Sequence, residues 1–317
     1  MITFSQFFKQ WSRAYYAQSV EIGKRGDFYT AVSVGNLFGV LLANHFLKLI
    51  DDKKIFLPVN VVEIGANEGY LAFDFLQALY TLRPAILDEI QFHIIEPHKR
   101  LRVKQSSLFL KYELDVKIHE SFNTCCFENT FFYANELFDC FACELILGDM
   151  MAYVDKNYHI YFKKANEKIL QQCKRYNITN SELCIEYHSF FKKLKSSCKN
   201  IIFDCFDYAK KEEKISTRIY KNHQTYNILD EKLQDFFGKS DITYNVNFEH
   251  LIKVLQEEDF IILDFKNQNE ALIDFGLEEI LNLTKKNNES IYKNFINQSQ
   301  NLVFNFGDKF KFLEFKL

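Results

Sequence analysis

The sequence predicts an α/β fold with a mostly parallel, Rossmann-like sheet. From residue 58 onward, short apolar segments alternate with segments of helical periodicity, and this alternation is typical of βαβ units. A loop that contains two glycines follows the first apolar segment and precedes a helix, as in nucleotide-binding α/β proteins. The chain has 317 residues, 48% of them apolar, which suits one large domain or a core with a substantial insertion.

The first 57 residues are expected to form two helices joined by a loop. Residues 3–17 place aromatic side chains at helical spacing, and residues 35–50 contain a second helical pattern. Glycines bracket the loop at residues 22–30 between them. The aromatic residues of the first segment are Phe4, Phe7, Phe8, Trp11 and Tyr15.

The rest of the chain contains the predicted sheet. Strands are expected at 58–64, 90–95, 115–118, 130–134, 200–206, 259–265, 302–305 and 309–316, and helices at 69–81, 98–111 and 186–197. Residues 145–165 alternate with a period of two around Asp155-Lys156-Asn157, which predicts a β-hairpin. The expected organisation is an N-terminal part at 1–57, a core at 58–144 and 199–317 with a polar helical insertion at about 208–258, and an inserted hairpin and helix at 145–198.

Charge and hydropathy argue against two classes of partner. The 39 Lys and Arg residues are balanced by 42 Asp and Glu residues, so no net basic field favours nucleic acid. The most apolar stretch, 131–147, is interrupted by Asn135, Glu136, Asp139 and Glu144, which a membrane span would not carry. We therefore expect a cytoplasmic protein without a membrane span.

Eight cysteines raise the question of a metal site. Cys140 and Cys143 have the CxxC spacing, and the pair Cys125-Cys126 lies nearby in the sequence, so four thiolates could in principle hold zinc. Because Cys140 and Cys143 lie among apolar residues and the usual paired spacing is absent, the better interpretation is reduced, buried thiols. No metal is expected.

The loop after the first core strand is the predicted cofactor site. Glu63, Gly65, Asn67 and Gly69 follow the strand, and the glycines allow the backbone to pass close to a ligand. The G-x-G-x-x-G spacing of dinucleotide enzymes is absent. An acidic residue at the strand end instead suits S-adenosylmethionine, which carries a cationic amino group and sulfonium. Asn67 stands at a position that requires a positive φ, which Asn tolerates.

A second carboxylate supports this interpretation. Glu96 ends the next predicted strand, where the ribose hydroxyls of a bound nucleoside would lie. Together, Glu63 and Glu96 favour S-adenosyl-L-methionine over a dinucleotide.

Several separated segments resemble one family, in the order in which that family has them. They are Tyr15-Tyr16, Gly26–Ala31, Phe38-Gly39, Val62–Gly65, Ile95–Pro97, Leu101-Arg102, Gln105, Ala134–Asp139, Asp207-Tyr208, Tyr220 with His223, Ser240–Thr243, Val246–Phe248, Gly307 and Phe310-Lys311. On these residues the chain resembles the MidA-type methyltransferases, which include the mitochondrial complex I assembly-factor arginine methyltransferase.

The resemblance implies a class I methyltransferase core with an additional substrate-covering region. It implies that Glu63, Gly65 and Glu96 hold the cofactor and that Gly26-Asp27-Phe28 forms part of a lid over the same cleft, with Gly26, Asp27 and Tyr29 as further cofactor-binding residues. It further implies that Asn135, Glu136 and Asp139 face the transferred methyl group. The sequence departs from the family at Asn67, where a glycine is usual, and at Val32–Gly35, where a carboxylate is lost.

Carboxylates after the fourth strand suit the methylation of a guanidinium. They can orient its planar donors and accept the proton that is released. Glu136 is the first candidate, with Asp139 and Glu186 as supports, although either support could equally be a charge at a helix start. We expect arginine methylation on a partner protein. The alternatives are a small-molecule methyltransferase and a non-catalytic assembly or interaction protein with the same fold.

Overall fold

The computed structural model describes residues 1–17, 34–221 and 224–317. These residues form two compact units. Of the described residues, unit 1 contains 1–17, 136–192, 207–221 and 224–259, and unit 2 contains 34–135, 193–206 and 260–317. The sequence predicted other boundaries, at 57/58, 144/145 and 198/199. The two units instead group the N-terminal helix with the segments 136–192 and 207–259.

Unit 2 is built on a seven-stranded sheet in the order β14-β15-β10-β5-β2-β3-β4. The pairs β10–β5, β5–β2, β2–β3 and β3–β4 are parallel, whereas β14 and β15 pair antiparallel. The bounds are β2 Val59–Ile64, β3 Ile90–Ile95, β4 Val116–His119, β5 Thr130–Asn135, β10 Ile201–Tyr208, β14 Ile261–Asn267 and β15 Phe310–Lys316. The predicted α/β fold with a mostly parallel sheet is confirmed.

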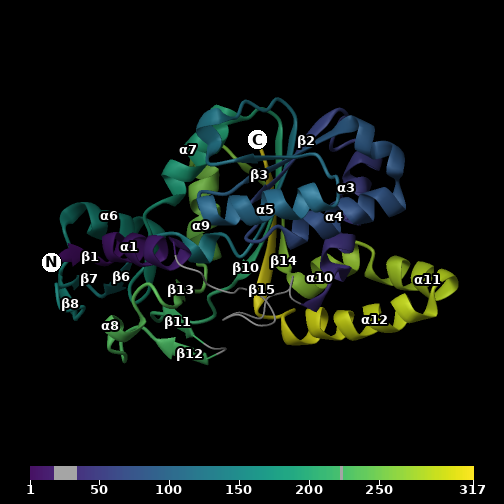
Figure 1. Cartoon of the computed structure of the whole chain (residues 1–317). Coiled ribbons are helices and arrows are strands. Elements are labelled where there is room, and N and C mark those ends of the chain that lie inside the picture. Colours follow the sequence, from purple (N-terminus) through teal and green to yellow (C-terminus); the bar gives the residue numbers. More distant parts are fainter. Residues whose placement is uncertain (18–33, 222–223) are drawn as a thin grey trace. The chain divides into compact units, whose positions relative to one another are not determined.

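Helices cover this sheet through large aromatic side chains. Phe46 of α3 (Leu37–Asp51) lies 5.7 Å from Phe75 of α4 (Tyr70–Leu82) and 5.1 Å from Phe131 of β5, measured between ring centroids. Each of these rings is fully buried, and such burial is the main contribution to stability. The other helices of the unit are η1 Pro84–Glu89, α5 Lys99–Lys111, η2 Phe122–Thr124, α10 Gln268–Asp274, α11 Leu277–Asn287 and α12 Glu289–Gln300. Figure 1 shows α11 and α12 side by side.

Unit 1 contains two antiparallel sheets. In the first, β1 (Ile2–Thr3), β7 (Met150–Val154), β6 (Cys143–Leu147) and β9 (Glu182–Cys184) lie in that order, and β8 (Ile160–Lys164) pairs with β7. The second has the order β12 (Gln224–Asn227), β11 (Arg218–Lys221), β13 (Asp241–Thr243). The remaining elements are α1 Phe4–Ala17, η3 Phe138–Cys140, α6 Glu167–Tyr176, α8 Leu233–Phe236 and α9 Phe248–Glu257. Helix α7 (Tyr187–Ser197) continues from unit 1 into unit 2.

The aromatic face of α1 forms the hydrophobic core of unit 1. Phe4, Phe8 and Trp11 are almost completely buried and pack with residues of β6, β7 and β13. Trp11 Nε1 also donates a hydrogen bond to the Ser240 carbonyl, at 2.6 Å. The helical spacing of aromatic residues in 3–17 therefore predicted both the helix and its buried face.

Two sequence predictions were wrong. Residues 302–305, predicted as a strand, belong to a π-helical turn at Asn301–Asn305 that continues α12. Leu302 is buried while Phe304 is 78% exposed, although both would share one face of a strand. The segment 208–258 was expected to be a polar insertion with helical fragments. It contains the helices α8 and α9, but it also forms the sheet of β11, β12 and β13, which was not predicted. These three strands have three or four residues each and contain no apolar run by which a strand could be recognised.

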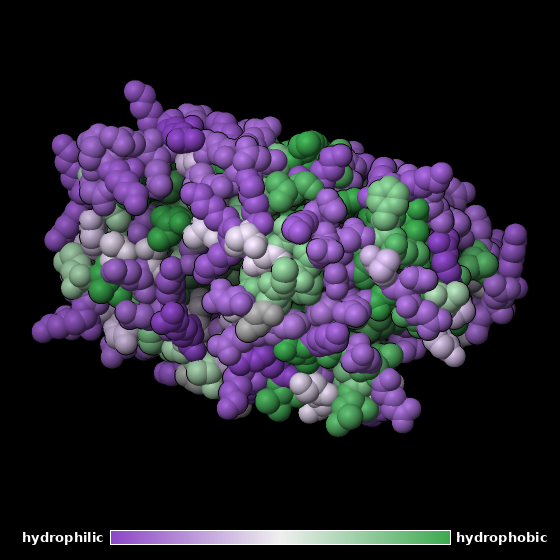
Figure 2. Space-filling view, turned by 90° about the horizontal axis from the view of Figure 1, so that it is seen from above, coloured by the Kyte–Doolittle hydropathy of each residue, from purple (hydrophilic) through white to green (hydrophobic). Residues whose placement is uncertain are grey.

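The predicted hairpin at 145–165 is confirmed as β7 and β8, which pair with Val154 opposite Ile160. Within the described residues, every helix is too short or too polar to span a membrane. Hydrophilic residues cover most of the face drawn in Figure 2, and apolar residues occur there in separate patches.

Candidate active site

The loop after β2 has the backbone conformation that its sequence predicts. Gly65, Asn67 and Gly69 all have positive φ, at 71°, 49° and 90°. Asn67 therefore takes the left-handed conformation in place of the usual glycine, which confirms the prediction for this residue. Gly69 precedes the first residue of α4, and a Cβ atom there would come within 3.2 Å of the Phe109 ring. The loop thus needs glycine at Gly69 both for its φ and for its close approach to α5.

Glu63 is a buried carboxylate at the end of β2. It is 3% exposed, and Tyr133 of β5 donates a hydrogen bond to its Oε2 at 3.1 Å. Burial raises the pKa of Glu63 to about 8, although the Tyr133 hydrogen bond acts in the opposite direction. Glu63 forms no ion pair with the described residues. A cationic ligand would stabilise its charged form.

Glu96 is a second buried carboxylate, at the end of β3. It is 2% exposed, and its Oε1 accepts a hydrogen bond from the His98 backbone N–H at 3.0 Å. Burial raises the pKa of Glu96 to about 7, against the lowering effects of the His98 hydrogen bond and of the Arg102 charge. Arg102 itself donates to the Glu96 backbone carbonyl at 2.9 Å. Because Arg102 bonds to the backbone carbonyl, the carboxylate of Glu96 can still accept hydrogen bonds next to the loop after β2.

The register of the sheet brings these groups to one edge of unit 2. Ile64 is opposite Ile95 in the β2–β3 pair, and Glu63 is opposite Tyr133 in the β2–β5 pair. The carboxyl ends of the three parallel strands therefore meet where open α/β sheets bind ligands. The structure brings together Glu63, Gly65, Asn67, Gly69 and Glu96, as the sequence predicted.

Buried polar atoms at this edge fit S-adenosyl-L-methionine. Gln105 Nε2 donates to the Asn67 carbonyl at 2.6 Å, but Asn67 Oδ1 and Gln105 Oε1 are buried and accept no hydrogen bond from the described residues. Such acceptors normally have partners. Ribose hydroxyls and an amino group are donors, and the two carboxylates would balance the positive charge of the cofactor.

The residues that follow β5 form an unusual turn in unit 1. Glu136 has a positive φ of 56°, which is rare for a side chain of this kind and occurs often at functional sites. Asp207 holds the next residues: its Oδ2 accepts hydrogen bonds from the backbone N–H groups of Leu137 at 3.1 Å, Phe138 at 2.7 Å and Asp139 at 3.3 Å. The turn that presents Glu136 is therefore fixed by one buried carboxylate.

Asp139 lies in this turn and is only 2% exposed. Burial raises the pKa of Asp139 to about 6, although the Cys140 thiol, which donates to its Oδ1 at 3.2 Å, and the Arg218 charge both lower it. Asp139 is thus a group that titrates near neutral pH, as a proton acceptor must.

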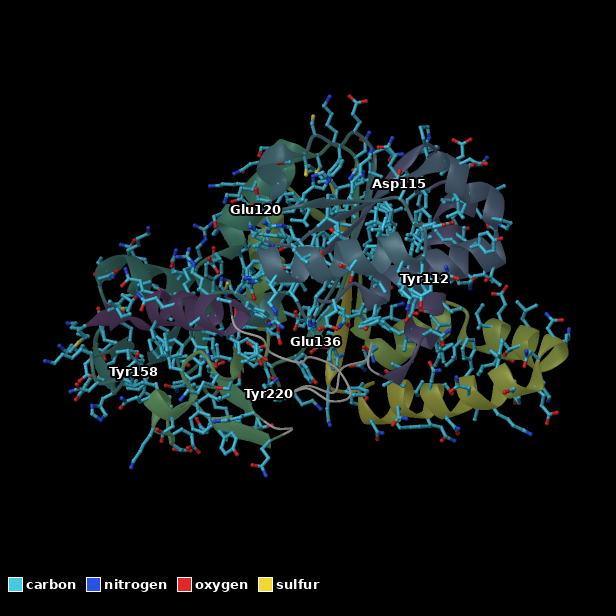
Figure 3. All side chains as sticks on the ribbon, in the orientation of Figure 1. Tyr112, Asp115, Glu120, Glu136, Tyr158 and Tyr220 are labelled. Atoms are coloured by element: carbon cyan, nitrogen blue, oxygen red, sulfur yellow. The ribbon has the colours of Figure 1, made fainter. Side chains whose placement is uncertain are left out.

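Arg218 of β11 is held among aromatic rings of the same unit. Its Nε donates to the Tyr220 hydroxyl at 2.7 Å, and its Nη1 donates to Asn245 Oδ1. The guanidinium carbon lies 5.1 Å from the centre of the Tyr208 ring and 5.3 Å from that of Tyr220. Glu136 and Tyr220 lie near one another (Figure 3), and the Glu136 charge helps to raise the pKa of Tyr220 after burial.

Glu186 has structural partners for both of its carboxylate oxygens. Oε2 accepts a hydrogen bond from the Ala142 backbone N–H at 2.6 Å, and Oε1 forms an ion pair with Lys9 of α1 at 2.8 Å. Glu186 immediately precedes α7, where a carboxylate also stabilises the helix start. We therefore base the proposal below on Glu136 and Asp139. Gly26, Asp27 and Tyr29, which the resemblance assigns to a lid, lie outside the described residues.

The sequence interpretation missed the roles of Asp207 and Arg218. Asp207 carried a signal, because it lies at the end of an apolar run in β10, as Glu63 does in β2. Its function as the acceptor for three N–H groups depends on residues about 70 positions away in the chain. Arg218 lies in a segment that was predicted to be helical.

Comparisons with known proteins identify the fold and the family of this chain. Residues 41–265 match a family model described as S-adenosyl-L-methionine-dependent methyltransferase. A methyltransferase homologue from Burkholderia thailandensis, solved with S-adenosyl-homocysteine bound, superposes with a TM-score of 0.78 at 19% identity, covering 100% of this chain and 88% of that one. A native structure of a protein of the same superfamily, also from Burkholderia thailandensis, superposes with a TM-score of 0.79 at 19% sequence identity. The match covers 100% of this chain and 87% of that one. Among the curated proteins, none matches this chain.

These structural likenesses establish the fold, and the family model covers well over half of the chain. The core in unit 2 is thus that of a class I methyltransferase, with additional strands and helices. The chain belongs to the MidA-type family of S-adenosyl-L-methionine-dependent methyltransferases, and S-adenosyl-L-methionine is its cofactor.

Proposed function

We propose that this methyltransferase modifies an arginine side chain on a partner protein, with Glu136 as the residue that contacts the acceptor guanidinium. The observation that carries the proposal is the turn after β5. Glu136 is held at a positive φ, and Asp207 fixes the three residues that follow it. A strained backbone at a strand end supports a functional role for the side chain that it presents.

Methyl transfer to a guanidinium requires both orientation and removal of a proton. A carboxylate can accept two parallel N–H bonds from the planar group and so direct one nitrogen toward the methyl carbon. Bound S-adenosyl-L-methionine supplies the methyl group and a neutral thioether leaving group. As the nitrogen–carbon bond forms, the nitrogen loses a proton, which Glu136 or Asp139 accepts. The pKa of Asp139, about 6, suits this role because the group is mostly ionised at neutral pH.

On the cofactor side, we assign roles to the residues of unit 2. Glu96 would accept hydrogen bonds from ribose hydroxyls, and Glu63 would balance the positive charge of the cofactor from the end of β2. The buried oxygen Asn67 Oδ1, which accepts no hydrogen bond from the described residues, would take a donor from the bound molecule. The roles of Glu63 and Glu96 rest on the burial of the two carboxylates and on their raised pKa values.

A protein substrate is supported by the family resemblance and by the acceptor chemistry. The aromatic segments outside the sheet do not add to this support, because Phe4, Phe8 and Trp11 are used in the core of unit 1. A small cationic amine is the other acceptor that two carboxylates would accommodate.

A labelling experiment tests the proposal. The purified chain is incubated with methyl-labelled cofactor and a proteome extract, and the labelled site is located by mass spectrometry. Label on arginine in a protein supports the proposal, whereas label only in the small-molecule fraction contradicts the assignment of a protein substrate. The variant Glu136→Gln should lower the rate by about 100-fold or more. The control Glu128→Gln removes a carboxylate whose side chain is 82% exposed and should leave the rate unchanged.

A further inference from the structure

A cluster of three metal-ligand side chains lies in unit 2, apart from the residues assigned to the cofactor. His45 comes from α3, Asp204 from the middle of β10 and Glu314 from β15. His45 Nε2 lies 3.0 Å from Glu314 Oε2 and 3.4 Å from Asp204 Oδ2, and one ligand atom from each residue lies within 4.8 Å of the other two. Three segments that are far apart in the sequence thus direct N and O donors to one point.

The spacing of these atoms suits a small divalent cation. Ligand bonds to zinc are roughly 2.0–2.2 Å long, so donors at a tetrahedral ion are about 3.3 Å apart. The distances from His45 Nε2, 3.0 and 3.4 Å, lie close to this separation. An imidazole with two carboxylates is also a donor set that first-row divalent metals accept.

The cluster is buried, and the carboxyl groups of Asp204 and Glu314 interact within it. Asp204 is 0% exposed, faces the Glu314 carboxyl group, and has His45 Nε2 at 3.4 Å from its Oδ2. Burial raises the pKa of Asp204 well above its ordinary range, and the Glu314 charge adds to the shift. Two adjacent carboxylates are unfavourable in such a place, and the imidazole of His45 can supply at most one positive charge against them. A divalent cation would balance both.

The imidazole of His45 is held in place by aromatic rings. It stacks on Phe275 with centroids 3.9 Å apart and an interplanar angle of 9°, and it meets Phe312 of β15 edge-on at 6.1 Å. Its side chain keeps 15% exposure, whereas the Glu314 side chain keeps 6%. The histidine is therefore the side of the cluster that an ion can approach from solvent, and little rearrangement is needed to bind one.

We propose that His45, Asp204 and Glu314 form a binding site for a divalent transition-metal cation, with Zn²⁺ as the probe. The ion would join α3 to β10 and to the C-terminal strand β15, so its role would be to stabilise unit 2. It would not touch the residues assigned to the cofactor, and the proposal is independent of the substrate of the methyltransferase.

The metal content of the full chain tests this site directly. The protein is first stripped of metal with a chelator and then incubated with Zn²⁺. Excess ion is removed by gel filtration, and the bound zinc is measured by inductively coupled plasma mass spectrometry. We expect about one Zn²⁺ per chain in the wild type and less than about one tenth of this in His45→Gln. Wild-type protein without zinc, or an unchanged content in His45→Gln, would overturn the proposal.

His188→Gln is the matched control. His188 also lies between two carboxylates, but it uses opposite ring nitrogens: Nδ1 is 2.7 Å from Glu258 Oε1, and Nε2 is 3.4 Å from Glu257 Oε2. A single ion cannot bind both ring nitrogens, so this variant should keep the full zinc content. Loss of zinc in His188→Gln together with retention in His45→Gln would place the ion elsewhere.

A second measurement needs only the wild type and so does not depend on the folding of a variant. The chain has eight cysteines that could also take zinc. Co²⁺ bound at the proposed site should show visible d–d bands without the near-ultraviolet thiolate charge-transfer band, which would appear at a cysteine site and contradict the proposal. Zn²⁺ in large excess over its Kd should also raise the unfolding midpoint by about 3–6 °C. No change in that midpoint would contradict a stabilising role.

Discussion

The carboxylate of Asp207 accepts a hydrogen bond from the Phe138 backbone N–H at 2.7 Å, across 69 positions of sequence. The same oxygen also accepts hydrogen bonds from the backbone N–H groups of Leu137 and Asp139. The bonds from Phe138 and Asp139 are buried, so these two N–H groups have no water to replace the carboxylate. Asp207 therefore determines the conformation of the turn that presents Glu136, and its removal should affect both stability and methyl transfer.

The first prediction concerns this carboxylate. Asp207→Ala should lower the free energy of unfolding by roughly 2–4 kcal/mol, because it leaves several buried donors without an acceptor. Asp207→Asn keeps one acceptor oxygen and should cost less. Urea unfolding measures both, and Asp230→Ala, at an exposed position, is the control. If Asp207→Ala were as stable as the control, the assigned role of Asp207 would be wrong.

The second prediction concerns the pH dependence of cofactor binding. Burial raises the pKa of Glu96 to about 7 and that of Glu63 to about 8. Their ionised forms are the ones that attract a cation and accept ribose hydroxyls, so affinity for S-adenosyl-L-methionine should increase as the pH rises from about 6 to about 8.5. Calorimetric titration at several pH values measures this. Glu96→Gln should bind more weakly and lose part of the dependence; an unchanged profile would argue against Glu96.

The third prediction concerns the stability of the chain without cofactor. Glu63 has a folded-state pKa of about 8, above its ordinary 4.5, so the folded chain holds this proton more tightly than the unfolded chain does. Its contribution to the free energy of unfolding is fully present below pH 4.5 and is lost as the pH rises through about 8. Glu63→Gln, which resembles the protonated form, should lose less stability than the wild type between pH 5 and 9. If the free energy of unfolding changed with pH by the same amount in both proteins, the prediction would be contradicted.

The fourth prediction separates backbone and side-chain roles of Asn67. Its φ of 49° is available to glycine without strain, so Asn67→Gly should change stability by less than about 1 kcal/mol. Asn67→Val should lose roughly 1–2 kcal/mol, because a β-branched residue is strained there. Thermal unfolding measures both changes. If Asn67→Gly keeps its stability but binds the cofactor several-fold more weakly, the side-chain oxygen of Asn67 contacts the ligand. Equal binding would mean that Asn67 serves only the backbone conformation of the turn.

Much of unit 2 could be predicted from local features of the sequence. Strand β3 has the predicted bounds, residues 90–95, and β2 begins one residue later than predicted. Buried parallel strands are short apolar runs, and the helices between them have their own periodicity, so both can be recognised without knowledge of contacts. Because these strands could be recognised, the positions of Glu63 and Glu96 at strand ends also predicted that both lie at one edge of the sheet.

The sequence by itself therefore determined the fold class, the left-handed Asn67 in the loop after β2, and the family. Only the tertiary structure decided that Asp207 fixes the turn after β5, that 218–243 contains a sheet, and that His45, Asp204 and Glu314 converge. Periodicity and turn preference are properties of neighbouring residues. A hydrogen bond between residues 69 positions apart, or a cluster drawn from α3, β10 and β15, depends on how the chain folds back on itself, which local patterns do not encode.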